Sequence, residues 1–495
     1  MINYVVGTNL NLKHFYIKSV GRLSKNINIM EFEQEEALEP MSPTAQYLKS
    51  SVLSLTIMVV LEVEVPIDDS MTIPLLKDVF LPINHRFSSI MVSKKSGGKK
   101  WKRVEVNLKD HVIVPVFPCD KSKDYYDECF HEYLSKLGMD QLPLNRPLWE
   151  IHIFKYPTKN AAGNVIFKLH HSLGDGYSLM GALLSCLKRL DNPSIPLTFP
   201  SRQSNSNSGP NLNSHGYFSR VPEFFSGLIN TAYNFGSNLL KSSFIEDDKS
   251  PIRSGHDGVE HGPSVITTTT FSIAQIKQIK NKLQVTINDV ITGIIMYGTR
   301  LYMQRANQDS SKEKCTALVL LSTRAIGGYK SVSEMIKPNA EMPWGNRFTF
   351  LHVPIPKLTA SELNNPLKLV DKAHQIIKRQ RNSASVYLIG QFLEAIRKIR
   401  GPEATSGYIY GTLKNSSLAI SNMTGPVEKM ALANHPIKGL YFAVVGVPQS
   451  LQVTILSYVD NLRIVMSVEK GFIDPNKFKS CMEYAFEAIY KAVLE

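Results

Sequence analysis

The chain has 495 residues, of which 43% are hydrophobic and 20% charged, a composition that disfavours wholesale disorder, collagen and a coiled coil. At about 100 to 200 residues per domain, this length accommodates two to four domains. The formal net charge of +13 points to anionic partners such as phosphates, anionic lipid or nucleic acid, and does not choose among them.

The N-terminal segment predicts neither secretion nor a membrane anchor. Residues 1–29 are basic and lack the apolar core of a signal peptide. Their composition is compatible with a transit peptide, and equally with an extension that is disordered or has no structural role. No run reaches the roughly 20 apolar residues of a membrane-spanning helix. Residues 439–459 come nearest, but Pro448 and Gln449 interrupt them, and their composition predicts two buried strands.

The five cysteines are widely spaced and odd in number, which favours a reduced, cytosol-facing chain without a disulfide framework.

Residues 30–200 predict a first lobe of mixed α and β structure. Apolar residues at three- and four-residue spacing predict amphipathic helices over 124–139 and 176–190. Strand composition occurs at four places between these helices and before them: residues 51–65, 88–95, 103–108 and 164–171.

A polar segment over 201–216, rich in Ser and Asn, begins a linker that we place at 201–261. Within it, residues 217–244 carry one apolar stripe and predict a helix that either packs on the core or lies in a membrane interface. Residues 262–495 again mix strands with helices and predict a second lobe.

One segment carries specific chemistry: His170-His171-Ser172-Leu173-Gly174-Asp175-Gly176 lies where an apolar strand ends and a helix begins. An imidazole with an ordinary pKa of about 6.5 is largely neutral at pH 7 and can take a proton from a hydroxyl. Asp175 suits orientation better than proton transfer, because it can cap the helix and hold the loop. The local chemistry leaves open a pair of structural histidines. A metal site with His171 and Asp175 lacks a third ligand in the sequence.

Other common catalytic motifs are absent from the sequence. There is no Gly-x-Ser-x-Gly elbow, no complete dinucleotide fingerprint and no phosphate-binding P-loop. These absences disfavour a serine hydrolase, a Rossmann dehydrogenase and a P-loop NTPase.

The His-His-x-x-x-Asp-Gly segment resembles the active-site motif of CoA-dependent acyltransferases, and further segments resemble the plant wax ester synthase/diacylglycerol acyltransferase family. These segments are Pro147-Leu148-Trp149-Glu150, Asn288-Asp289-Val290, Trp344-Gly345-Asn346 and Ser421-Asn422-Met423-Thr424-Gly425-Pro426. Their order and spacing match from about residue 38 to the C-terminus. The chain departs from the family pattern at Asn84-His85-Arg86-Phe87, where His-Pro-Arg-Phe is usual, and at Ser322-Thr323-Arg324, where Asn is expected first.

The resemblance implies a mixed α/β fold of two similar lobes with an active-site tunnel between them. Acyl-CoA would enter from one face and a long-chain alcohol or diacylglycerol from the other. It also implies roles for seven residues: His171 as general base, His170 as its neighbour, Asp175 as the structural acid, and Gly176, Trp149, Asn288 and Arg324 in substrate binding. The chemistry needs no metal and no cofactor beyond the acyl-CoA substrate, because thiolate is a good leaving group and one base suffices. The position of Asn288 at a helix start is equally consistent with a structural role as the N-cap of that helix.

Two other functions compete with this one. A plant acyltransferase acting on phenolics or other alcohols shares the histidine motif, but its Asp-Phe-Gly-Trp-Gly block cannot occur here, because no Trp follows Trp344. A catalytically silent lipid-binding protein is the second alternative.

The expected partners also include a membrane surface. The family's substrates suggest the cytosolic face of the endoplasmic reticulum, with the plasma membrane as an alternative. Residues 217–244 and the basic segment 94–103 are the expected contacts, although 94–103 also reads as a plain hairpin tip. Nucleic acid is not expected, since Trp101 is the only aromatic residue in that segment. No feature of the sequence predicts an oligomeric state.

Overall fold

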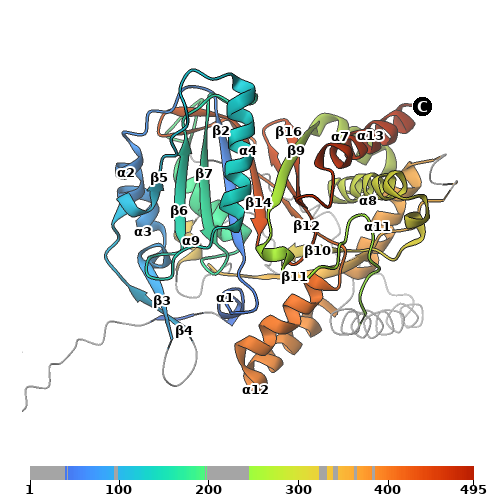
Figure 1. Ribbon diagram of the computed structural model, residues 1–495, viewed down its shortest axis with the longest axis horizontal. Helices are drawn as coiled ribbons and strands as arrows, with labels where there is room; N and C mark the ends of the chain where they lie inside the picture. The colour runs from blue at the N-terminus through green and yellow to red at the C-terminus, as the bar shows by residue number, and fades with distance from the viewer. Residues whose placement is uncertain are drawn as a thin grey trace, which may run out of the picture.

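Two lobes, each built on a mixed β-sheet, lie side by side in the computed structural model (Figure 1). The structure describes residues 39–41, 43–93, 99–195, 197, 245–322, 332–337, 344–359, 361, 365–381 and 385–495. The predicted two-lobed α/β architecture is confirmed. The expected extension 1–29, the helix 217–244 and Arg324 lie outside the described residues.

The sheet of the first lobe has seven strands and is covered by helices on both faces. Its order is β5 (Val112–Ile113), β6 (Trp149–Phe154), β7 (Gly163–His170), β2 (Thr56–Val63), β14 (His435–Val445), β13 (Met430–Leu432) and β8 (Leu187–Arg189). Helix α4 (Lys123–Met139) packs on one face through Tyr126, Phe130 and Leu134. Helices α2 (Thr72–Leu75), α3 (Leu81–Ile83) and α5 (Gly176–Ser185) lie on the other face (Figure 1). All eight residues of β2 and of β7 are buried, including the polar residues Glu62, Asn164 and Lys168.

Two strands of this sheet come from the far end of the chain. Strand β14 pairs antiparallel with β2, and β13 pairs with β8. The C-terminal half therefore completes the first lobe's sheet, so the two lobes are not independent in strand pairing. The helix predicted over 176–190 ends at Ser185, because Leu187–Arg189 is needed as the strand that pairs with β13.

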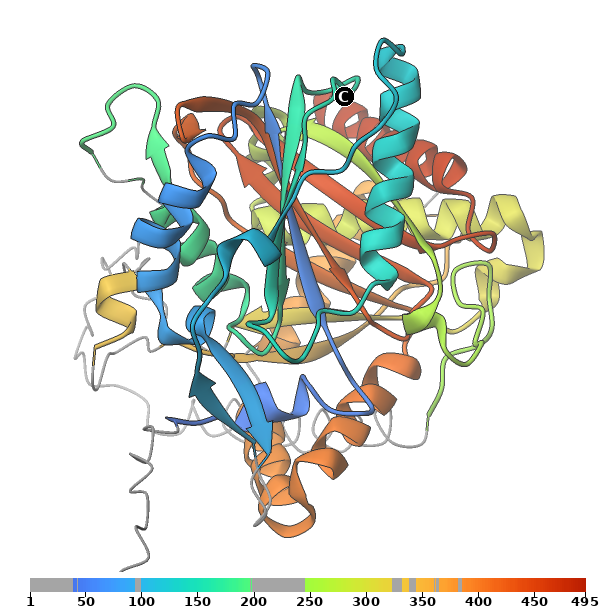
Figure 2. The ribbon, with the colours of Figure 1, turned by 60° about the vertical axis from the view of Figure 1, so that its left-hand side comes forward.

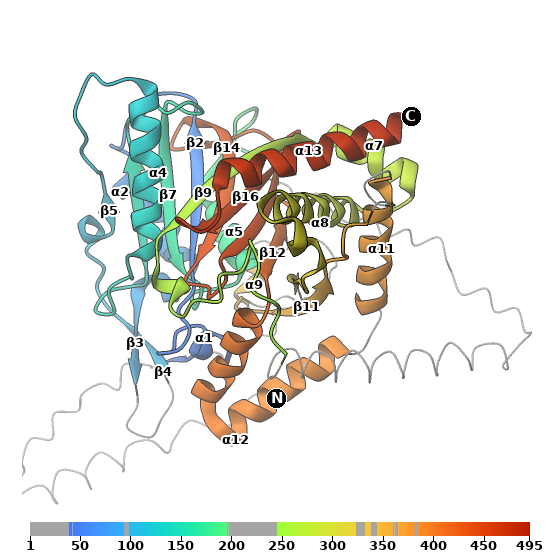
Figure 3. The ribbon, with the colours of Figure 1, turned by 45° about the vertical axis from the view of Figure 1, so that its right-hand side comes forward.

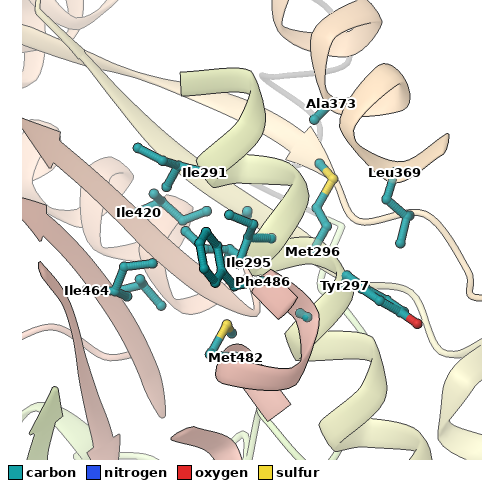
Figure 4. Close-up of a cluster of buried hydrophobic side chains, with 14 of the residues drawn as sticks. Ile291, Ile295, Met296, Tyr297, Leu369, Ala373, Ile420, Ile464, Met482 and Phe486 are labelled. Carbon is teal, nitrogen blue, oxygen red and sulfur yellow. The ribbon is translucent and has the colours of Figure 1, made fainter. Parts of the chain in front are cut away.

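The second lobe has a six-stranded sheet with long helices on one face. The order is β11 (Phe348–Pro354), β10 (Thr316–Ser322), β12 (Leu418–Met423), β15 (Leu451–Tyr458), β16 (Asn461–Glu469) and β9 (Ser264–Ser272). Helices α7 (Ile273–Leu283), α8 (Ile287–Ala306), α11 (Leu367–Arg381) and α13 (Pro475–Leu494) bury their apolar stripes against it. In this core, Ile291 and Ile295 of α8 contact strand residues such as Ile420, together with Met482 and Phe486 of α13 (Figure 4). The opposite face of the sheet turns toward the first lobe, where Ile266 and Val465 pack with α4.

Smaller elements project from the body of the molecule. A three-stranded sheet consists of β1 (Glu39–Pro40), β4 (Lys99–Arg103) and β3 (Ser89–Ser93), with α1 (Pro43–Tyr47) beside it (Figure 2). The strand predicted over 103–108 is therefore misplaced, because β4 precedes it and is held in register by buried Trp101. The short helix α9 (Val332–Met335) lies near α5. Helix α12 (Ser385–Lys414) bends sharply at Gly401, where φ is +85°, and protrudes as a helical hairpin (Figure 3).

Within the described part of the chain, no helix is both long enough and apolar enough to cross a membrane. All five cysteines are free. Residues 439–459 form the buried strands β14 and β15, as predicted.

Candidate active site

The histidine motif occupies a rigid strand end followed by a capped helix. Strand β7 ends at His170, between its neighbours β2 and β6. Asp175 is the N-cap of α5, and its Oδ1 accepts a hydrogen bond from the Ser178 N–H at 2.9 Å. Because both ends of the loop are fixed in this way, the side chain of His171 has a defined position.

His171 is held by an asparagine that lies 175 positions further along the chain. Its Nδ1 lies 2.9 Å from Oδ1 of Asn346, and Nδ2 of Asn346 donates to the main-chain oxygen of His171 at 2.9 Å. Since an amide oxygen can only accept, Nδ1 must carry the proton and Nε2 must carry the lone pair. Burial lowers the pKa of His171 below its ordinary value, which keeps the ring neutral at pH 7. The residue is thus presented as a base.

His170 is engaged differently, because both of its ring nitrogens have partners in the protein. Nδ1 accepts a hydrogen bond from the Ser172 N–H at 3.0 Å, and Nε2 lies 3.1 Å from Oγ of Ser54. Burial holds the pKa of His170 well below its usual range. The ring fixes the loop and has no nitrogen free for a substrate.

Asp175 joins the two lobes. Its Oδ2 accepts a hydrogen bond from the Arg347 N–H at 3.0 Å, in the segment that precedes β11. In the same place, Ser178 Oγ donates to the Gly345 main-chain oxygen at 3.1 Å. The carboxylate therefore secures both the start of α5 and the segment that carries Asn346.

Two further side chains fix the middle of the histidine loop at the carbonyl of Leu173. Trp344 Nε1 donates to this oxygen at 2.8 Å, and Arg86 Nη1 donates at 3.2 Å. Arg86 belongs to the segment Asn84-His85-Arg86-Phe87, which departs from the family pattern. Its side chain nevertheless reaches the histidine loop. Burial lowers the pKa of the Arg86 guanidinium. The Cζ atom of this group lies 6.0 Å from the centroid of the Trp101 ring.

A cavity of about 380 Å³ opens between the lobes beside His171. Its wall is mainly apolar and is built from both sheets, with Ile57 and Val59 from β2 and Leu320 and Leu321 from β10. The lining also has polar side chains, among them Ser421, Arg347 and the hydrogen-bonded pair Asn288 and Asn422. This combination suits a ligand with a long hydrocarbon chain and a few hydrogen-bonding groups.

The predicted substrate-binding residues fall into three groups. Gly176 and Asn288 line the cavity. Asn288 is not the helix cap, since Thr286 caps α8 in a capping box with Asp289; its Oδ1 accepts a hydrogen bond from Asn422 Nδ2 at 2.6 Å. Arg324 lies outside the described residues.

Trp149 does not line the cavity, contrary to the expectation that it binds substrate. Its indole is fully buried in the first lobe, stacks on His111 and donates from Nε1 to the Phe87 main-chain oxygen at 2.8 Å. A large apolar ring on a strand buried on both faces is placed by core packing. Trp149 is therefore a core residue next to the site.

Sequence reasoning assigned no role to Asn346, Arg347, Phe348 or Met423, all of which contact the motif or line the cavity. The only signal for Asn346 was its place in the Trp344-Gly345-Asn346 segment. Among the described residues, no three His, Cys, Asp or Glu side chains form a group suited to a metal ion.

Comparison with known proteins gives two family matches. Residues 89–291 match the wax ester synthase/diacylglycerol acyltransferase catalytic domain, and residues 344–490 match the WS/DGAT C-terminal domain. Wax ester synthase/diacylglycerol acyltransferase 7 of Arabidopsis thaliana is 27% identical, with 92% of this chain and 98% of the relative covered. Wax ester synthase/diacylglycerol acyltransferase 11 from the same plant is 29% identical, and the match covers 92% of this chain and 96% of the relative.

A solved structure, the wax ester synthase/diacylglycerol acyltransferase from Marinobacter aquaeolei VT8, superposes with a TM-score of 0.59 at 16% identity. The match covers 92% of this chain and all of the bacterial chain. The epimerization domain from the third module of tyrocidine synthetase B superposes with a TM-score of 0.51 at 10% identity, over 93% and 96% of the two chains. At sequence identities of 16% and 10%, these superpositions show that the fold is similar.

Proposed function

Because the chain belongs to the wax ester synthase/diacylglycerol acyltransferase family and is an acyl-CoA-dependent O-acyltransferase, we propose that it esterifies long-chain alcohols, diacylglycerol or both. The observation that carries this proposal is a neutral histidine at the wall of an apolar cavity between the lobes, whose Nε2 has no hydrogen-bond partner in the part of the chain that the structure describes. Such a cavity accommodates hydrocarbon chains and excludes competing water.

In the proposed mechanism, Nε2 of His171 removes the proton from the acceptor hydroxyl as its oxygen attacks the thioester carbonyl carbon. The tetrahedral intermediate collapses with loss of the CoA thiolate, which takes the proton back from His171 Nε2. Asn346 keeps the ring in the required tautomer throughout. Asn288, whose Oδ1 is occupied by Asn422, retains its NH₂ group to donate to the developing oxyanion or to the acceptor hydroxyl. The mechanism requires neither a metal nor a covalent enzyme intermediate.

The test is to incubate the purified full-length protein with labelled palmitoyl-CoA and either hexadecanol or diacylglycerol, and to separate the products. We expect a labelled wax ester, a labelled triacylglycerol or both. An ester formed only with a phenolic acceptor would move the protein to the competing acyltransferase group. Binding of palmitoyl-CoA with no ester from any acceptor would support the silent lipid-binding alternative.

For the location, we propose peripheral binding to the cytosolic face of the endoplasmic reticulum. The support is indirect: the expected acceptors partition into bilayers, and no described helix is suited to span one. The segment 217–244 lies outside the described residues and stays the predicted contact, with burial of its apolar stripe contributing several kcal/mol at about 25 cal/mol per Å². Replacing Phe224 and Phe225 with Ser should release the protein from liposomes, and retention of the variant would contradict this assignment.

A further inference from the structure

The proposed reaction brings two long hydrocarbon chains to one histidine. Cavities of about 300 to 1,000 Å³ hold one drug-sized ligand in known proteins, and the cavity beside His171 measures about 380 Å³. One chain would occupy most of this space. The second chain therefore needs room that adjoins the cavity, and this requirement rests on the proposed function.

Two smaller hollows share wall residues with the cavity. The first, between the lobes, shares Gln452 with it and also has Gln449 and Glu260 in its wall. The buried Oε1 atoms of both glutamines and Oε2 of Glu260 have no hydrogen-bond partner within the described part of the chain. A hydrocarbon chain placed there would leave these acceptors unsatisfied at a cost of about 1 to 3 kcal/mol each. This hollow suits water or a hydroxyl group and disfavours an apolar chain.

The second hollow lies between strand β11 and helix α12, the protruding hairpin in Figures 2 and 3. It shares Phe348 and Phe350 with the cavity. Helix α12 contributes Ile389, Leu393 and Tyr408 to the remaining wall, which also contains the polar residues Thr349, His352 and Thr412. With four aromatic rings and three aliphatic side chains in its wall, this hollow is less polar than the first and suits a hydrocarbon chain better.

Among the described residues, the two spaces share the aromatic rings of Phe348 and Phe350 as their boundary. Phe348 and Phe350 stand edge to face with their centroids 5.7 Å apart, and Phe348 lies 5.4 Å from the ring of His171. Both side chains project from the same face of β11, which is the edge strand of its sheet. A rotation of either ring would join the hollow to the space beside the base.

We propose that Phe348 and Phe350 form a gate, and that the hydrocarbon chain of the acceptor alcohol lies between them in the hollow under α12. A largely apolar hollow accommodates an uncharged hydrocarbon chain. The proposed occupant is the acceptor, and the acyl-CoA profile in the test below distinguishes the acceptor from the acyl chain. The hollow now measures about 30 Å³, so the chain must also displace α12 outward. Helix α12 is already broken at Gly401, where φ is +85°. Phe350 then determines which acceptor chain lengths are accepted.

The test compares Phe350→Ala with the full-length wild-type protein over a series of linear alcohols from octanol to octadecanol, at a fixed palmitoyl-CoA concentration. We expect the ratio of kcat/KM for the longest to the shortest alcohols to change by about tenfold, the size typical of pocket changes of this kind. Phe350→Trp should change the same ratio in the opposite direction, and it serves as the readout if the alanine variant does not fold. The preference for acyl-CoA chain length should stay as in the wild type.

Leu321→Ala is the matched control, because Leu321 lines the cavity but not the hollow. An equal change of alcohol preference in this variant would mean that any enlargement of the cavity has the effect, and would overturn the gate. The inference is also overturned if the Phe350 variants form ester with an unchanged alcohol profile, or if they alter the acyl-CoA profile instead. Absence of ester in the wild type would refute the proposed function itself, so the two failures are distinguishable.

Discussion

The amide of Asn346 determines which nitrogen of His171 faces the substrate. With Nδ2 donating to the His171 main-chain oxygen, Oδ1 is directed at Nδ1 of the ring. Burial is the largest influence on the pKa of His171 and outweighs the hydrogen bond to Asn346 and the charge of Asp175, which both raise it. A neutral amide raises this pKa less than a carboxylate in the same place would. Burial can then keep this pKa below about 6.5, its ordinary value, and maintain the free base at neutral pH.

Replacing Asn346 should separate orientation from charge. In Asn346→Ala, both hydrogen bonds to His171 are lost, and loss of the one to the ring, worth about 1.4 kcal/mol, predicts a drop in kcat of roughly tenfold. In Asn346→Asp, a carboxylate beside the ring favours the imidazolium, so the pKa of His171 rises and the acid limb of the pH–rate profile moves to higher pH. The measurement is kcat/KM from pH 5 to 8 for both variants. An acid limb that stays in place or moves downward in the Asp variant would exclude this contact.

At the level of elements, the site depends on a strand, a loop and a helix that are secured by one carboxylate. Asp175 caps α5 through Oδ1 and accepts the Arg347 N–H through Oδ2. Its position in the motif is therefore explained by two main-chain contacts from different lobes. The charged group lies where the positive end of the helix dipole stabilises it.

Asp175→Ala should lower both stability and activity. Loss of a cap costs about 0.5 to 2 kcal/mol, measured as a reduced free energy of unfolding or a lower Tm, and the loosened loop should also reduce ester formation. Ser122→Ala is a matched control, since Ser122 caps α4 away from the cavity through the Tyr125 N–H. That variant should lose stability and keep its activity. An Asp175→Ala protein with wild-type melting and no activity would instead indicate direct chemistry by the carboxylate.

The local pattern of apolar residues predicted most helices and strands, but it did not predict strand pairs between segments that lie far apart in the sequence. Helix α4 and strand β7 carry their periodicity and burial in their own residues, so their positions were predicted closely. The pairing of β14 with β2 joins segments almost 400 residues apart, and no local pattern encodes it. The site shows the same division: the histidine motif was recognisable, but its contact with Asn346 exists only once the two lobes meet.

At the scale of the whole molecule, side-chain contacts between the lobes set their distance at the site. Glu62 of β2 and Arg463 of β16 form an ion pair across the interface, with Oε1 and Nη1 2.7 Å apart. Beside the site, Gly176 of α5 faces Met423 of β12 so closely that a Cβ at Gly176 would lie 2.5 Å from the methionine sulfur. The last glycine of the motif therefore permits the first lobe to approach the second.

Gly176→Ala tests this close approach. The methionine side chain must move, and because Met423 lines the cavity we expect reduced turnover. The Tm should change little, since the methionine is flexible and alanine is well tolerated in a helix. Adding Met423→Ala should restore part of the activity by removing the conflict. If the double variant is no more active than Gly176→Ala, the glycine serves a purpose other than this contact.

The most direct measurement is ester formation from palmitoyl-CoA by His171→Ala beside His170→Ala and the wild type, with melting curves for all three. Removal of a positioned general base predicts a loss of about a hundred- to ten-thousand-fold for His171→Ala with a wild-type Tm. His170→Ala should lose less activity and more stability, because both of its ring nitrogens bind the protein. Equal losses of activity in the two variants, or substantial activity in His171→Ala, would contradict the assignment of His171 as the base.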